Sequence, residues 1–136
     1  MLRVFADTVY WFALLSPRDA LHTKALEASR IYKSHEIGTS EMVLTELLNG
    51  FSETGQQRRA AVVRAVASLR DLGQVTIYPQ TSRLFASAFE RYRLMSDKGW
   101  SLTDCSSFII MEERHVTSAL THDQHFAQAG FQALLR

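Results

Sequence analysis

Two kinds of hydrophobic pattern alternate along the chain. Short apolar runs rich in β-branched and aromatic residues predict buried strands over residues 2–6, 36–40, 74–79, 116–121 and 131–135. Between them, apolar residues recur every three or four positions, which predicts helices over 8–15, 20–32, 41–51, 56–73, 82–95 and 123–130, and one that begins near Ser101. Because strands alternate with helices, the pattern predicts an α/β fold with a short, mostly parallel sheet and helices on both faces.

The sequence also indicates where several helices begin and end, and which faces they bury. Thr8 is the predicted N-cap of the first helix, and either Ser101 or Thr103 caps the helix that contains Asp104. Gly73 suits the position that follows a helix C-terminus. In the helix over 82–95, the residues predicted to face the core are Leu84, Phe85, Ala88, Phe89 and Tyr92.

Length and composition are those of an ordinary globular protein. The 136 residues suit a single domain over 1–136, and 46% of them are hydrophobic and 21% charged. The longest apolar runs are too short to span a bilayer, and the N-terminus has no apolar stretch of signal-peptide length. The single cysteine, Cys105, excludes an internal disulfide and suits a reducing compartment. We therefore expect a cytoplasmic protein without a membrane segment.

Four acidic residues occupy positions that a parallel sheet would bring to one edge. Asp7 and Asp123 each follow a predicted strand. Asp104 opens a predicted helix, and Glu46 lies among leucines in another. Each position has an ordinary explanation, since an acid can begin a loop, favour a helix N-terminus or face solvent. Ligands of α/β sheets bind beyond the carboxyl ends of the strands, however, so the four acids together predict a site at this edge.

A cluster of carboxylates needs a counter-charge. Carboxylates buried side by side repel one another and take up protons rather than stay ionised. A hard divalent cation removes this cost, because it binds carboxylate oxygens directly. The cluster therefore predicts a site for Mg²⁺, with Mn²⁺ as an alternative.

Four short motifs carry these acids, and together they resemble a known family. "FADTVYW", "TELLNG", "SLTDCSSF" and "LTHDQHF" are similar to the four acidic motifs of PIN-domain ribonucleases, and most similar to those of VapC-type toxins from bacterial toxin–antitoxin pairs. The resemblance covers nearly the whole chain in order. It implies a PIN-like three-layer α/β/α sandwich and a Mg²⁺-dependent endoribonuclease that acts as the toxin of such a pair.

The resemblance also assigns roles and partners. It makes the catalytic and metal-binding residues Asp7, Glu46, Asp104 and Asp123. Of these, Glu46 and Asp123 would act partly through water. The hydroxyl groups of Thr8 and Thr121 would orient carboxylates or waters, or would simply cap and close turns. Hydrolysis by a water whose pKa the metal lowers would leave 5′-phosphate and 3′-hydroxyl ends. The implied partners are RNA, a cognate antitoxin and a second copy of the chain in a homodimer.

Charge and exposed apolar residues suggest where these partners would bind. The net charge is +1, but without the four acids ten acidic residues remain against 15 basic ones. Two helices carry arginines that could contact RNA phosphates or simply face solvent, namely Arg58, Arg59, Arg64, Arg91 and Arg93. An antitoxin helix could occupy a groove formed by apolar residues of the first helices, namely Trp11, Phe12, Leu14, Leu15, Leu47, Leu48 and Phe51.

Other functions fit the same acids. A non-catalytic interaction module could bind a structural ion, and a PIN-type nuclease could act on other nucleic acid outside a toxin–antitoxin system. A zinc site or general base formed by His122 and His125 around Asp123 is a weaker alternative. We expect His125 to order the turn through a hydrogen bond, beside Phe126 in the core, and Cys105 to be a small buried thiol.

Overall fold

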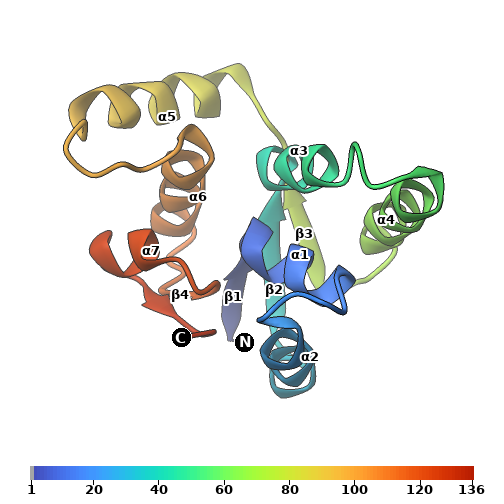
Figure 1. Ribbon diagram of the computed structural model, residues 1–136. Coiled ribbons are helices and arrows are strands. Elements are labelled where there is room, and N and C mark those ends of the chain that lie inside the picture. The colour runs from blue at the N-terminus through green and yellow to red at the C-terminus, as the bar shows by residue number, and fades with distance from the viewer. Residues whose placement is uncertain (1) are drawn as a thin grey trace.

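The computed structural model describes residues 2–136, which form a five-stranded parallel sheet with helices on both sides (Figure 1). The strands are β1 (Arg3–Ala6), β2 (Glu36–Ser40), β3 (Val75–Tyr78), β4 (Ser118–Leu120) and β5 (Gln132–Ala133). The helices are α1 (Thr8–Leu15), α2 (His22–Ile31), α3 (Glu41–Gly50), α4 (Gln56–Leu69), α5 (Ser82–Leu94), α6 (Leu102–Glu113) and α7 (Gln124–Gln128). The predicted α/β fold with a parallel sheet is therefore confirmed. Among residues 2–136, no helix combines the length and hydrophobicity needed to cross a membrane.

The strand order β3-β2-β1-β4-β5 places the first strand at the centre of the sheet. The chain extends the sheet from β1 through β2 to β3, and then crosses to the other side of β1 for β4 and β5. Val4 of β1 pairs with Ile37 of β2, and Ala6 of β1 pairs with Leu120 of β4. The direction of winding reverses between β1 and β4, and ligands of open α/β sheets bind at such a switch point.

Helix α6 is the most deeply buried helix and supports this edge of the sheet. Every residue from Asp104 to Met111 is buried, because α6 packs against α3, α5 and α7. Phe108 makes edge-on ring contacts with Trp100 and Phe126. Cys105 is the buried thiol that the sequence predicts. The apolar run that follows Asp104 is thus explained by core packing on several sides of one helix.

Two of the predicted helix ends are wrong, and one is right. Asp7 occupies the N-cap position of α1, and Thr8 is the first helical residue. Helix α4 ends at Leu69 rather than just before Gly73, since the chain has to turn back there to begin β3 in register with β2. Ser101 caps α6 as predicted, because its hydroxyl oxygen accepts a hydrogen bond from a backbone N–H of the first turn.

The predicted inner face of α5 is only partly right. Leu84 and Ala88 are buried, but Phe85, Phe89 and Tyr92 are 47%, 54% and 52% exposed. Helix α5 lies across α6 and apart from the sheet (Figure 1), so only the narrow strip that touches α6 is covered. The three exposed rings form what we call the aromatic stripe, in which the ring centroids of Phe85 and Phe89 are 6.3 Å apart.

Candidate active site

One pocket of about 390 Å³ is lined by all four acids predicted from the sequence. Asp7 reaches it from the end of β1, and Asp123 from the segment between β4 and α7. Asp104 comes from the first turn of α6, and Glu46 from α3. The pocket therefore lies at the switch point between β1 and β4, where the topology favours a ligand site.

Asp7 is the most deeply buried of these acids, with only 4% of its surface exposed. The Thr121 hydroxyl donates a hydrogen bond to Asp7 Oδ2 at 2.9 Å and so fixes the carboxylate. Burial raises the pKa of Asp7 to about 7, and the nearby charges of Asp104 and Glu46 add to the rise, while hydrogen bonds from Thr121 and the Thr8 backbone oppose it. Without a cation, this carboxylate is costly to keep ionised at neutral pH.

Asp104 has two roles at the start of α6. In the first role it belongs to a capping box, since its backbone N–H donates to Ser101 Oγ at 3.0 Å and the Ser101 N–H donates to Asp104 Oδ2 at 3.1 Å. In the second, its carboxylate faces the pocket. Burial raises the pKa of Asp104, and the hydrogen bonds from Ser101 and His125 partly offset this rise. The position therefore serves both the helix N-terminus and the acidic cluster.

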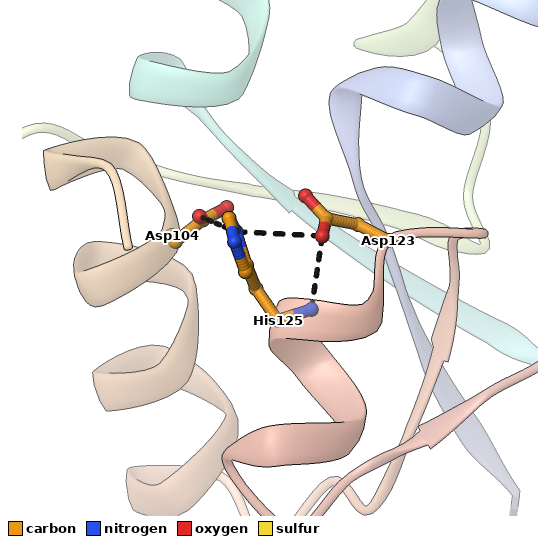
Figure 2. Close-up of side chains that lie close together, drawn as sticks. All are labelled: Asp104, Asp123 and His125. Carbon is orange, nitrogen blue, oxygen red and sulfur yellow. Dashed lines mark hydrogen bonds and ion pairs between the residues drawn. The ribbon is translucent and has the colours of Figure 1, made fainter. Parts of the chain in front are cut away.

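Asp123 and His125 form the turn that leads into α7. Asp123 is the N-cap of α7, and its Oδ1 accepts a hydrogen bond from the His125 N–H at 2.9 Å. Phe126 is fully buried beside them, and the predicted hydrogen bond that orders this turn is present, although the His125 backbone rather than its ring donates it. The His125 ring does more, however, because its Nδ1 lies 3.0 Å from Asp104 Oδ2 and 3.4 Å from Asp123 Oδ1 (Figure 2).

The two predicted threonines differ in their contacts. Thr121 is fully buried between two acids, since its Oγ1 donates to Asp7 and accepts from the Asp123 N–H at 3.1 Å. Thr8 lines the pocket, but its Oγ1 is buried without a hydrogen-bond partner among the described residues. The geometry thus gives Thr121 a direct part in orienting carboxylates.

Several other pocket residues were not predicted. Asp19, in the loop between α1 and α2, lines the pocket and accepts a hydrogen bond from the Leu21 N–H at 2.8 Å. Phe12 and Gly99 also line it. Nothing in the local pattern distinguishes these residues, because α1 and two loops reach the pocket only through tertiary packing. For His125, the spacing of two residues from Asp123 was the available signal.

The donor set fits a hard divalent cation. A carboxylate oxygen of Asp104, one of Asp123 and a ring nitrogen of His125 all lie within 4.8 Å of one another. Asp7, Asp104 and Asp123 each have a carboxylate oxygen oriented by a hydrogen bond. Carboxylate oxygens are the ligands that Mg²⁺ and Mn²⁺ prefer, and a cation would offset the burial and the repulsion that raise the pKa of Asp7 and Asp104.

Comparison with known proteins places the chain in a family. A model of the PIN domain matches residues 4–132. The chain belongs to the PIN-domain family. This PIN domain is 35% identical over 133 residues to the "23S rRNA-specific endonuclease VapC20" of Mycobacterium tuberculosis, in two strains, which covers 94% of this chain and 95% of VapC20. The family predicted from the four acidic motifs is therefore confirmed, and the PIN domain is of the VapC endonuclease type.

Solved structures agree with this assignment. The crystal structure of Mycobacterium tuberculosis VapC20, described as a sarcin–ricin loop cleaving toxin, aligns with a TM-score of 0.81 and 28% identity over 94% of this chain and 95% of that one. PAE2754 from Pyrobaculum aerophilum aligns with a TM-score of 0.61 and 14% identity over 98% of this chain and 90% of that one, which shows the shared fold alone. The PIN-like architecture predicted from the sequence is thus confirmed.

Proposed function

We propose that this PIN domain is the toxin of a toxin–antitoxin pair and hydrolyses 23S ribosomal RNA, with Mg²⁺ or Mn²⁺ held by Asp7, Glu46, Asp104 and Asp123. The observation that supports it most directly is the meeting of these acids, from four separate segments, in one pocket at the switch point of the sheet. The ribosomal substrate is inferred from VapC20, whose name states that specificity and whose chain aligns over nearly its full length. The antitoxin is inferred from the same VapC-type homology.

The residues in and around the pocket determine how an ion would be held and which nucleophile could attack the phosphate. When bound, a divalent cation supplies a water of lowered pKa and charge stabilisation at the phosphate. Asp7, directly after β1, and Asp104, in the first turn of α6, provide buried carboxylates from two separate elements. Glu46 is exposed on α3 and closes the pocket from that helix. Cys105 is fully buried beside Asp104, which excludes it as a nucleophile, so that hydrolysis by water is the chemistry that fits.

The arginines differ in their availability for RNA. Arg91 forms a two-pronged ion pair with Glu112, and Arg93 pairs with Glu90. Arg58 and Arg64 are exposed on α4, and neither forms an ion pair within the described part of the chain. We therefore propose α4, rather than α5, as the helix whose arginines contact RNA phosphates.

The ribosomal substrate is tested by mapping cleavage. Purified protein should be incubated with intact ribosomes, with total RNA and with transfer RNA, and the new 5′ ends identified by primer extension. We expect one dominant cut in 23S ribosomal RNA, within the sarcin–ricin loop. A dominant cut in transfer or messenger RNA would replace the proposed substrate while leaving the nuclease assignment in place.

Only part of the groove predicted for an antitoxin is open at the surface. Trp11 and Leu47 are buried in the core, whereas Leu48 and Phe51 of the predicted set line a pocket between α3 and α4. The exposed apolar side chains in this region are Leu48 on α3 and Val63 on α4, which border a pocket of about 280 Å³ between these two helices. We propose this α3–α4 pocket as the place where an apolar antitoxin segment binds.

The homodimer is proposed to form through the aromatic stripe of α5. Three half-exposed rings supply roughly 300 Å² of apolar surface, against about 800 Å² per partner in a stable dimer. The stripe can therefore form the centre of a two-fold interface to which its neighbours contribute. Ala86, which is exposed beside it, allows a second helix to approach closely.

Light scattering tests this dimer surface. We expect Phe89→Glu to convert the protein from dimer to monomer at micromolar concentration, because it places a charge at the centre of the buried patch. Leu94→Glu is the matched control, since Leu94 is 62% exposed on the opposite flank of α5. If both variants had the same oligomeric state as the wild type, the aromatic stripe would not be the dimer interface.

A further inference from the structure

His125 contacts two of the pocket acids at once. Its ring Nδ1 lies 3.0 Å from Asp104 Oδ2, and its backbone N–H donates to Asp123 Oδ1 at 2.9 Å. Figure 2 shows the ring between the two carboxylates, one from α6 and the other from the start of α7. The ring stays partly accessible, since 25% of the side chain is exposed, and it lines the pocket.

We propose that His125 is a positioning residue, whose Nδ1–H donates to Asp104 Oδ2 and thereby holds the carboxylates of Asp104 and Asp123 in the arrangement that receives the divalent cation. The part played by the cation rests on the function proposed above. The inference adds a residue, His125, to the four acids of the proposed site. Its ring donates a hydrogen bond to a metal ligand and does not bind the metal itself.

The hydrogen-bond partners of Asp104 indicate which way the proton points. Asp104 Oδ2 already accepts from the Ser101 N–H at 3.1 Å, and Nδ1 of His125 approaches the same oxygen. An ionised carboxylate oxygen only accepts, so the nitrogen that approaches it carries the hydrogen. With both donors in place, Oδ2 is committed to the protein, and Oδ1 is the oxygen left to meet an external ligand.

The two carboxylates need such a donor because they repel each other. Asp104 lies in α6 and Asp123 precedes α7, and the charge of Asp123 adds to the rise in the pKa of Asp104 that burial causes. Nδ1 lies between them, 3.4 Å from Asp123 Oδ1 as well. A donor placed between two like charges keeps both carboxylates turned toward one point, whereas without it they would rotate apart.

Two substitutions of His125 distinguish the contribution of Nδ1 from that of Nε2. The amide nitrogen of His125→Asn stands where Nδ1 stands, and that of His125→Gln reaches the position of Nε2. Mn²⁺ affinity, measured without RNA from the electron paramagnetic resonance signal of free Mn²⁺, should stay within about threefold of wild type in the Asn variant. In the Gln variant it should weaken by about 10- to 100-fold, the usual effect of losing a partner that orients a metal ligand.

The control and the second measurement make the test decisive. His122→Gln is the matched control, because His122 is exposed in the same loop and does not line the pocket. His125→Ala serves as a second variant without a donor should the Gln variant fail to fold, and melting temperatures report folding. Electron spin-echo spectroscopy of bound Mn²⁺ should show no directly coordinated ¹⁴N in the wild type.

Each other result would overturn the proposal. Rescue by Gln and not by Asn would assign the role to Nε2, and equal effects of both would remove the hydrogen bond as the cause. Direct ¹⁴N coordination that disappears in His125→Asn would make the ring a ligand. Because Mn²⁺ binding is measured without RNA, a wild-type protein that binds Mn²⁺ but leaves ribosomal RNA intact would contradict the proposed function alone.

Discussion

The Asp7→Asn variant is expected to lose RNA cleavage by about a thousandfold or more, which corresponds to roughly 4 kcal/mol of transition-state stabilisation. Asparagine keeps the shape of Asp7 and can still accept the hydrogen bond from the Thr121 hydroxyl. It removes only the negative charge that would hold the cation in a pocket where Asp7 is almost fully buried. Asp104→Asn should behave in the same way.

The same variant should be more stable than the wild type when no metal is present. The folded-state pKa of Asp7, about 7, lies above its ordinary value of 3.8, so the folded protein binds a proton more tightly than the unfolded one. The contribution of Asp7 therefore makes stability fall as pH rises from about 4 to about 7, by up to roughly 4 kcal/mol for a shift of this size. Asp7→Asn should lack this decrease.

Urea unfolding in EDTA at several pH values measures the stability difference, and a fluorogenic RNA assay measures cleavage. Asp97→Asn is the control, because Asp97 has 72% of its side chain exposed, in a loop outside the pocket. It should change neither property. If Asp7→Asn cleaved RNA like the wild type, the acidic cluster would not be the catalytic site, and an ion bound there would have a structural role alone.

Excess EDTA should reduce cleavage by the wild type about a thousandfold or more, and added Mg²⁺ or Mn²⁺ should restore it. In the pocket, carboxylates supply the charge that attracts the cation, and the described residues that line it include no lysine or arginine that could replace the cation at the phosphate. EDTA already saturated with Ca²⁺ controls for effects of the chelator itself. Circular dichroism should show that the metal-free protein remains folded.

The ends of the products check the same chemistry independently. Hydrolysis by water leaves a 5′-phosphate and a 3′-hydroxyl, whereas attack by the ribose 2′-hydroxyl leaves a cyclic phosphate. We expect ligation to a 3′ acceptor to succeed on the fragments without prior phosphatase or kinase treatment. Cyclic phosphates, together with cleavage that persists in EDTA, would show that the acids do not act through a metal.

The alternation of strands and helices, and the acids at the ends of β1 and β4, could be predicted from the sequence. These features depend on local periodicity and on the rule that parallel strands end at one edge of the sheet. Asp7 and Asp123 could be placed at that edge for this reason. The segment around Asp104 was informative as well. An acid before a long apolar run indicates the start of a helix, and its position suggests that the carboxylate belongs to a site.

Which side chains are exposed and which residues meet in the pocket was decided by tertiary packing alone. The aromatic residues Phe85 and Phe89 have helical spacing typical of a core face, but α5 packs mainly against α6 and along another face, so these rings are exposed. Asp19 enters the pocket from a loop without any local signal. The ring of His125 meets Asp104 only because α7 packs beside α6. Sequence periodicity tells which residues share a face of one element, whereas burial, raised pKa values and contacts between elements depend on which neighbours that face meets.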